Sequence, residues 1–413
     1  MKNVSSSNSQ GELVPKLRFP GFVGEWELKA LGDLLTFQNG INAPAEKYGK
    51  GIKYISVMDI LNNAYITYDR IKGLVDVDDQ TLKTYSVEYG DIVFQRSSET
   101  PEDIGHSNVY LDDKTATFGG FVIRGKKTGD YNPLFLKYLL DGGTARKEII
   151  RMGQGAQHYN IGQEGLRRIS LYFPKEREQE KIAHLLELVE RKIELQVELI
   201  TTLKSYKRGL SAALFERRVR MKKKDRTAFP EWEKSTLGDI FLERNERASG
   251  GEKLLAVTIN GGVQDRSNLD LKDNSSEDKS NYRKVYVGDL AYNTMRMWQG
   301  ACGISSFDGI VSPAYTVLHV ADKANSEPRF WAHLFKQTSM MRLFQRNSQG
   351  LTSDTWNLKY DKFSKIAVEV PSLEEQTAIA DYLDGFSRFI KKHEDSLIEM
   401  ENYKRALLSQ MFI

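Results

Sequence analysis

The chain has little of several features on which particular protein classes depend. Only one of its 413 residues is a cysteine, Cys302, which excludes an intrachain disulfide and any zinc or iron–sulfur site built from clustered cysteines. No run of about 18 apolar residues occurs, so we expect no membrane-spanning helix. Neither sign of charge dominates, and a net charge of +3 excludes a polycationic coat protein. The first residues lack the apolar stretch of a signal peptide, so we expect a cytoplasmic protein.

The length of the chain and a hydrophobic content of 40% favour a folded protein of two or three domains. The second part of the chain repeats the first. The matched stretches, in order, are residues 25–34 with 231–240, 87–93 with 285–291, 154–155 with 349–350, and 159–215 with 356–412. Because all of them occur in the same order, chance similarity is a poor explanation, and we interpret the chain as an internal duplication.

Two long stretches have the pattern of paired helices. Apolar residues alternate at spacings of four and three over residues 178–215 and again over 372–413, which is the coiled-coil period. Lys207 and Lys404 interrupt the two apolar seams at equivalent places, and we interpret them as residues that fix the register. Ser372 followed by Glu375 predicts a capping box at the start of the second helix.

The predicted fold class is α+β: two tandem β-rich α/β modules in a pseudo-twofold arrangement, separated by an antiparallel coiled coil of two long helices. We expect the helices to be antiparallel because the first leads away from module one and the second starts from module two. The predicted parts are an N-terminal segment (1–24), a first module (25–174), a central long helix (175–218), a basic linker (219–230), a second module (231–371) and a C-terminal long helix (372–413).

Local patterns predict the same elements in both modules. Each has a strand after a Gly-Asp turn, a later apolar strand, a helix opened by proline and an alternating strand before its long helix. These predicted elements are 90–95 and 288–293, 121–123 and 315–318, 133–151 and 328–346, and 169–174 and 366–371.

Enzyme motifs are weak in this sequence. Residues 132–135 (NPLF) resemble the Asn-Pro-Pro-Tyr/Phe motif of amino-methyltransferases, but the second proline is missing and a helix-opening Pro133 explains the stretch better. Neither a Gly-x-x-x-x-Gly-Lys-Ser/Thr phosphate loop nor a His-Glu-x-x-His zinc motif occurs. We therefore expect no catalytic residues, no metal site and no cofactor bound by this chain.

Polar loops at matching positions in the two modules favour binding to nucleic acid. Asn, Gln and Arg side chains make paired hydrogen bonds to adenine and guanine edges, and arginines suit backbone phosphates, although Asn, Gln and Gly are also ordinary loop formers. The basic run at 217–226 is either a solvated linker or a contact to phosphate or a partner. The predicted DNA-contacting residues are Arg96, Ser97, Ser98, Arg151, Gln154, Gln157, His158 and Asn160 in module one, and Asn293, Arg296, Trp298, Gln299, Arg346, Gln349, Thr352, Ser353, Trp356 and Asn357 in module two.

A tandem module that ends each time in Pro-x-x-x-Glu-Gln-x-x-Ile and a long helix resembles the specificity (S) subunit of type I restriction–modification systems. The Trp-x-x-x-x-x-Gly-Asp openings of both modules fit the same family, and the resemblance covers nearly the whole chain. The residues that carry it are Pro174, Glu178, Gln179 and Ile182 with Pro371, Glu375, Gln376 and Ile379, and Trp26, Gly32 and Asp33 with Trp232, Gly238 and Asp239.

This resemblance implies that each module is a target recognition domain that reads half of a bipartite site in double-stranded DNA. It also implies that the helix pair sets the gap between the half-sites and docks two methyltransferase (M) subunits. Those subunits hold S-adenosylmethionine and methylate adenine at N6, and restriction (R) subunits add cleavage driven by ATP and Mg, while the S subunit is not catalytic. The alternative is a scaffold whose two modules bind proteins or glycans, but the Arg-bearing polar loops favour DNA.

Overall fold

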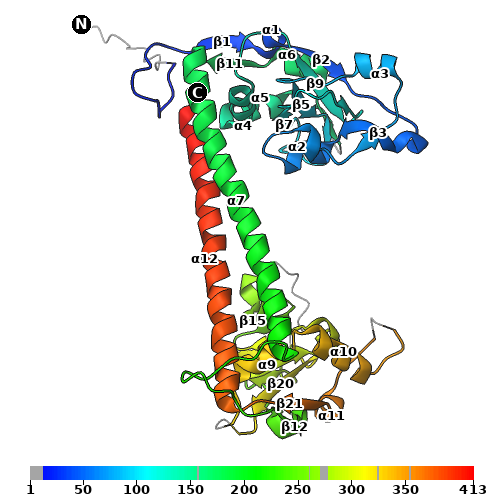
Figure 1. Cartoon of the computed structure of the whole chain (residues 1–413), viewed down its shortest axis with the longest axis vertical. Helices are drawn as coiled ribbons and strands as arrows, with labels where there is room; N and C mark the ends of the chain where they lie inside the picture. Colours follow the sequence, from blue (N-terminus) through cyan, green and yellow to red (C-terminus); the bar gives the residue numbers. More distant parts are fainter. Residues whose placement is uncertain (1–12, 156–157, 260, 270–277, 323–324, 353–354) are drawn as a thin grey trace. The chain divides into compact units, whose positions relative to one another are not determined.

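The computed structural model describes residues 13–155, 158–259, 261–269, 278–322, 325–352 and 355–413. They form two compact units. Unit 1 takes in the chain up to Glu198 together with Asp395–Ile413, and unit 2 is Leu199–Glu394. Two long helices, α7 (Glu176–Phe215) and α12 (Leu373–Met411), each contribute to both units (Figure 1). No helix in the described part of the chain is long and apolar enough to cross a membrane.

A four-stranded antiparallel sheet lies at the centre of unit 1. Its order is β2 (Leu35–Asn39), β9 (Val122–Lys127), β5 (Ile92–Gln95) and β7 (Ser107–Val109). One core joins this sheet to helices α4 (Pro133–Asp141) and α5 (Gly143–Met152) and to both long helices. Smaller elements of unit 1 are β1 (Glu27–Ala30), α1 (Leu31–Leu34), β3 (Tyr48–Ile55), α2 (Val57–Asn62), β4 (Leu74–Val75), α3 (Asp79–Thr84), β6 (Ser97–Ser98), β8 (Thr117–Phe118), β10 (Tyr159–Asn160), α6 (Gln163–Arg168) and β11 (Ser170–Phe173).

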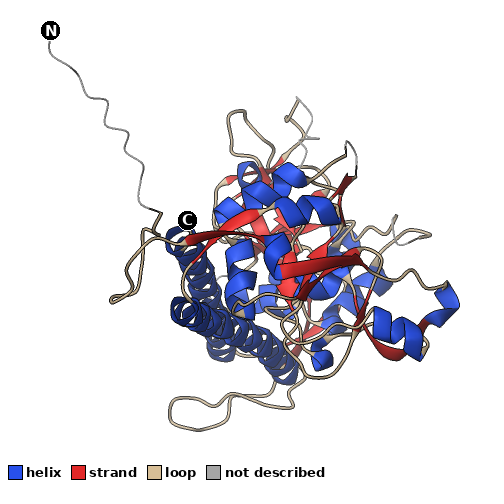
Figure 2. Cartoon of the chain, turned by 90° about the horizontal axis from the view of Figure 1, so that it is seen from above, coloured by secondary structure: helices blue, strands red, loops and turns tan. Residues whose placement is uncertain are grey.

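Unit 2 has an equivalent sheet with the same strand order. Here β13 (Phe241–Glu243), β20 (Tyr315–Val320), β17 (Leu290–Asn293) and β18 (Cys302–Ile304) pair antiparallel. Both units mix helices and strands. Figure 2 shows the helices of the chain in blue and its strands in red. Further elements of unit 2 are β12 (Glu233–Thr236), α8 (Leu237–Ile240), β14 (Leu255–Thr258), β15 (Gly262–Asp265), β16 (Arg283–Val285), β19 (Gly309–Val311), α9 (Pro328–Leu334), α10 (Thr338–Asn347), α11 (Tyr360–Phe363) and β21 (Ala367–Val370). The common strand order confirms the predicted tandem α+β fold.

Three local predictions need correction. The single helix predicted at 133–151 is two helices, because Gly142 between α4 and α5 has extended backbone, with φ −65° and ψ 148°. The helix predicted at 328–346 is likewise divided into α9 and α10, with Gln337 extended just before α10. The strand predicted at 121–123 begins at Val122, so that Phe121 lies in the preceding turn.

The long helices pack antiparallel inside each unit. In unit 1 the ammonium group of Lys404 pairs with the carboxylate of Glu190. In unit 2 Lys207 Nζ donates to Ser387 Oγ at 2.6 Å. Lys207 and Lys404 lie 197 positions apart in the sequence, and so do their partners Ser387 and Glu190. This distance is the offset of the sequence repeat. The predicted antiparallel pairing is therefore confirmed within each unit, with each seam lysine facing the same position of the other helix.

The Glu-Gln pair at the start of each long helix ties strand to helix. Gln179 is buried, accepts a hydrogen bond from the Asn132 N–H at 3.0 Å and donates one to the Pro174 carbonyl at 2.9 Å. Gln376 makes the equivalent two bonds in unit 2. A side-chain amide has both an acceptor and a donor, so it can bind two separate backbone segments at once. These glutamines therefore have a structural role in this chain.

The neighbouring glutamates are buried with arginine partners. Arg18 binds both carboxylate oxygens of Glu178 at 2.7 Å, and Arg220 donates to Glu375 at 3.0 and 3.4 Å. Only half of the predicted capping box forms. The Glu375 N–H donates to the Ser372 hydroxyl at 3.4 Å, but the Glu375 carboxylate is taken by Arg220 and by the Trp232 indole N–H.

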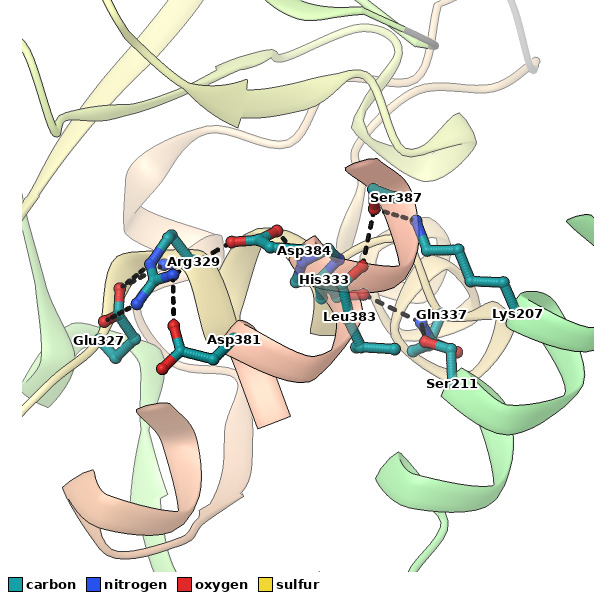
Figure 3. A network of polar contacts seen from close by, with 10 residues as sticks. All are labelled: Lys207, Ser211, Glu327, Arg329, His333, Gln337, Asp381, Leu383, Asp384 and Ser387. Atoms are coloured by element: carbon teal, nitrogen blue, oxygen red, sulfur yellow. Dashed lines mark hydrogen bonds and ion pairs between the residues drawn. The ribbon is translucent and has the colours of Figure 1, made fainter. Parts of the chain in front are cut away.

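Polar contacts also join the α9 region of unit 2 to the long helices (Figure 3). The His333 ring lies 2.8 Å from Asp384 of α12, and Gln337 Nε2 donates to Ser211 Oγ of α7 at 2.9 Å. Arg329 Nη1 lies 3.2 Å from the same aspartate. Helix α9 is thus bonded to one long helix, and the residues after it to the other.

Candidate nucleic-acid interface

In unit 1 the backbone brings together three loops that are far apart in the sequence. The Arg96 N–H, just beyond β5, donates to the Phe121 carbonyl at 2.9 Å, and the Ile161 N–H donates to the Arg96 carbonyl at 3.0 Å. Strands β6 and β10 then pair antiparallel, with Ser97 opposite Asn160. Because the N–H and the carbonyl of Arg96 are both hydrogen-bonded, the Arg96 segment is fixed between Phe121 and Ile161.

The Gln-Gly stretch of unit 1 begins a hairpin beside this segment. Gln154 and Asn160 exchange two backbone hydrogen bonds of 2.9 and 2.8 Å. Gly155 has a φ of +136°, and a Cβ there would lie 2.0 Å from the His158 carbonyl oxygen, so position 155 requires glycine. Ser97 Oγ donates to Asn160 Oδ1 at 2.5 Å. That bond orients the exposed Asn160 amide, of whose two N–H donors one goes to His158.

The other predicted residues of unit 1 have different environments. Ser98 is buried, and its hydroxyl donates to the Thr100 carbonyl at 2.6 Å, so it shapes the loop. Arg96 is half-buried, and its guanidinium donates to the Gly120 carbonyl at 3.2 Å. Arg151 is exposed at the end of α5, where it pairs with Glu148 at 2.9 Å. Gln157 lies outside the described residues.

Unit 2 repeats the same backbone arrangement. The Thr294 N–H donates to the Ala314 carbonyl at 3.1 Å, and the Leu358 N–H donates to the Thr294 carbonyl at 2.9 Å. Gln349 and Asn357 exchange two backbone hydrogen bonds of 3.0 and 2.8 Å. The two matched pairs of loops predicted from the sequence thus converge in each unit, through equivalent bonds.

The side chains on this arrangement differ between the units. In unit 2 the rings of Trp298, on the short helix η4 (Met297–Gln299), and Trp356 meet edge to face with centroids 5.2 Å apart. Asn293 Oδ1 accepts a hydrogen bond from the Met295 N–H at 3.0 Å. The remaining predicted residues are Arg296, Arg346, Gln349 and Thr352, which are exposed, Gln299, which is half-buried, and Ser353, which lies outside the described residues.

A cavity of about 490 Å³ opens beside the unit 2 arrangement. Asn357 lines it, and within the described part of the chain the buried Asn357 Oδ1 has no hydrogen-bond partner. Residues 243 and 283 lie in a stretch where the two repeats align poorly, which is why sequence comparison gave no signal for them. Our prediction missed the charged and tyrosyl residues that line this cavity, which are Glu243, Arg283, Lys359, Tyr360 and Asp361.

The aspartate of each Gly-Asp motif holds the strand that leads to the site. The buried carboxylate of Asp91 accepts from Arg124 Nε at 2.8 Å and from the Lys127 N–H at 2.9 Å. Burial raises the pKa of Asp91, and the nearby Arg124 charge acts in the opposite direction. In unit 2 Arg244 binds both oxygens of Asp289 at 2.7 and 2.9 Å. The Gly-Asp turns that precede β5 and β17 therefore have a structural role.

The basic run at 217–226 is largely paired within unit 2. Four of its basic residues form ion pairs, which differs from the solvated linker that was one of the two interpretations, and a contact to phosphate or a partner stays a prediction. The pairs are Arg217 with Glu369 at 2.6 Å, Arg218 with Glu216 at 2.7 Å, Arg220 with Glu375 at 3.0 Å and Lys223 with Glu374 at 3.2 Å.

Comparison with known proteins identifies the repeat. The sequence model of the family described as the type I restriction modification DNA specificity domain matches residues 24–205 and again residues 230–402. The crystal structure of a type I restriction-modification system S subunit from M. genitalium is similar, with 14% identity and a TM-score of 0.57 over 97% of this chain and 99% of that one.

A second similar structure comes from work on complex assembly and conformational transition of the type I R-M system. It has 14% identity and a TM-score of 0.56, and the match covers 95% of this chain and 98% of that one. At 14% identity, the similarity to these two structures shows a common fold alone. A search of curated protein sequences gives no match.

Proposed function

Since this chain belongs to the family of the type I restriction–modification DNA specificity domain and contains that domain twice, we propose that it reads a bipartite site in double-stranded DNA, one half-site with each unit. The observation that carries the proposal is the double family match. The repeated convergence of an Arg- or Thr-bearing segment with a Gln-Gly hairpin gives each unit one candidate reading surface.

Two kinds of contact are available on these surfaces. The exposed amides of Asn160 and Gln154 have the donors and acceptors that pair with base edges. The exposed guanidinium groups of Arg151 and Arg346 lie at the ends of α5 and α10, close in sequence to the hairpins, and suit phosphates. We assign the first pair to sequence readout and the second to affinity.

We further propose that catalysis resides in partner subunits. Two M subunits, holding S-adenosylmethionine, would methylate adenine at N6, and R subunits would use ATP and Mg to cleave. The neighbour described in the context of type I R-M complex assembly supports an assembled complex of this kind.

The surfaces of the long helices support two equivalent docking sites for M subunits. Tyr403 of unit 1 is 56% exposed beside a cavity of about 430 Å³, and Tyr206 of unit 2 is 59% exposed beside Phe386, with centroids 5.7 Å apart. The two tyrosines differ by 197 positions and are thus repeat equivalents. Exposed aromatic residues at equivalent positions fit two copies of one protein partner.

The test is to co-express the chain with a type I methyltransferase subunit encoded beside it, purify the complex and sequence the methylated DNA. We expect N6-methyladenine within one two-part motif. A continuous motif, or methylation without sequence preference, would contradict the two-reader proposal. The variant Tyr206→Ala with Tyr403→Ala should retain its fold but lose the M subunit. Binding of S-adenosylmethionine by the isolated chain would contradict its assignment as a non-catalytic subunit.

A further inference from the structure

One apolar side chain of the unit 1 site has no internal role that accounts for its position. Phe121 is 67% exposed and lies inside a tight turn closed by a 2.8 Å hydrogen bond from the Val122 N–H to the Gly119 carbonyl. A Cβ on the preceding Gly120 would lie 1.8 Å from Asn42 Oδ1, so a side chain there would displace Asn42. Turn positions favour Gly, Asn, Asp and Ser, so an exposed phenylalanine has no local advantage here.

The turn lies directly against the proposed reading segment. The Phe121 carbonyl accepts the Arg96 backbone N–H at 2.9 Å, and the Gly120 carbonyl accepts the Arg96 guanidinium at 3.2 Å. On the other side of Arg96 are Ser97 and Asn160. The turn that carries the exposed ring is therefore bonded to the segment that continues into Ser97 and its partner Asn160.

Unit 2 has the same turn without the ring. The Tyr315 N–H donates to the Ser312 carbonyl at 3.0 Å, and the Ala314 carbonyl accepts the Thr294 N–H at 3.1 Å. Ala314 thus occupies the place of Phe121. The backbone does not need an aromatic residue at this position, so the ring is a property of unit 1 alone.

We propose that the ring of Phe121 contacts the 5-methyl group of a thymine in the half-site read by unit 1, and so helps to set the specificity of that half-site. This inference rests on the proposed function. Phenylalanine can neither donate nor accept a conventional hydrogen bond, so it cannot read the polar edges of bases. In the major groove the apolar group on base edges is the thymine methyl, and it is the group that phenylalanine contacts.

The experiment uses the complex of the chain with its M subunits and a duplex that carries the motif found by methylation sequencing. Each thymine of the motif is replaced in turn by uracil, which lacks only the methyl group, and the dissociation constant is measured. We expect one replacement to weaken binding by about fourfold, the value of one buried methyl group. The variant Phe121→Ala should bind thymine and uracil duplexes equally, and Phe121→Leu should keep part of the difference.

Tyr89→Ala is the matched control. Tyr89 is 57% exposed in the same unit but precedes β5, whose far end leads to the site, so this variant should keep the full thymine–uracil difference. The proposal is overturned if Phe121→Ala keeps that difference, or if no thymine is sensitive. It is also overturned if 2-aminopurine fluorescence shows unstacking of bases that depends on Phe121, because the ring is then a wedge. Failure of the wild-type complex to bind any specific site would instead overturn the proposed function.

Discussion

Loss of the buried Asp91 carboxylate should destabilise unit 1 more than loss of Asp289 destabilises unit 2. The two aspartates are repeat equivalents, and each binds an arginine. The difference lies in that arginine, because the Arg124 side chain is 4% exposed and the Arg244 side chain is 23% exposed. Without its aspartate, Arg124 remains a buried charge, whereas Arg244 can reach water.

The expected loss of stability in each variant follows from the burial of the arginine that is left without its partner. Removing one partner of a buried ion pair costs about 3–5 kcal/mol, so we expect a loss in that range for Asp91→Ala. Asp289→Ala removes a bond to the Tyr286 N–H, as Asp91→Ala removes one to the Glu88 N–H. Because the arginine left by Asp289→Ala can be hydrated, we expect about 1–3 kcal/mol for that variant. Adding Arg124→Met to Asp91→Ala should restore part of the stability, because the unpaired charge is then gone.

Hydrogen exchange followed by mass spectrometry separates the two units within the intact chain. Exchange of β5 and β9 amides reports opening of unit 1, and exchange of β17 and β20 amides reports opening of unit 2. The expected result is faster exchange in unit 1 alone for Asp91→Ala and a smaller increase in unit 2 alone for Asp289→Ala. Equal effects, or a larger effect of Asp289→Ala, would refute the argument from burial.

Three further predictions concern binding and pH. Arg151→Ala or Arg346→Ala should weaken DNA binding for all sequences and reduce the slope of log K against log salt by about one, and an unchanged slope would remove either residue as a phosphate contact. Asn160→Ala should change the preference in one half-site only, by roughly 1–3 kcal/mol, and equal changes in both would contradict separate readers. Burial lowers the pKa of His333 below its ordinary 6.5 despite Asp384, so the unfolded chain binds more protons. The free energy of unfolding of unit 2 should therefore fall as the pH drops below about 6.5. In denaturation experiments at pH 5–7, His333→Gln should remove the part of this pH dependence that comes from the histidine.

The elements that the sequence predicted well are those with a long or repeated pattern. The alternating apolar seam predicted both long helices, which begin at Glu176 and Leu373, because such a seam is coherent over many turns. Breaks within a helix were harder to predict from the sequence. The stretch 133–151 has the composition of a helix throughout, and only backbone geometry shows that the extended Gly142 divides it.

The candidate site was predictable as a set of loops but not as an arrangement. Matching repeat positions indicated which segments to consider. The bonds that join Arg96 to Phe121 and to Ile161 link distant parts of the chain, and no local pattern encodes them. Phe121 was missed for the same reason, since its apolar character was attributed to a strand. Ser98 was included for its residue type, although its hydroxyl binds within its own loop.

The two units keep one backbone arrangement and vary the side chains that it presents. Arg96 in unit 1 stands where unit 2 has Thr294, and Phe121 stands where it has Ala314. The backbone hydrogen bonds of both positions are the same, and each side chain adds one bond, from the Arg96 guanidinium to the Gly120 carbonyl and from the Thr294 hydroxyl to the Ala314 carbonyl. The backbone bonds do not depend on the side chains, and a threonine hydroxyl at position 96 can make the bond that Thr294 makes in unit 2. Arg96→Thr should therefore leave the stability of unit 1 nearly unchanged and alter the preference of one half-site. Gln179→Ala, which removes the side-chain bonds at the strand–helix junction, should instead lower stability. Paired measurements of hydrogen exchange and methylation motif would contradict this separation of scaffold from readout if Arg96→Thr unfolded unit 1 or left the motif unaltered.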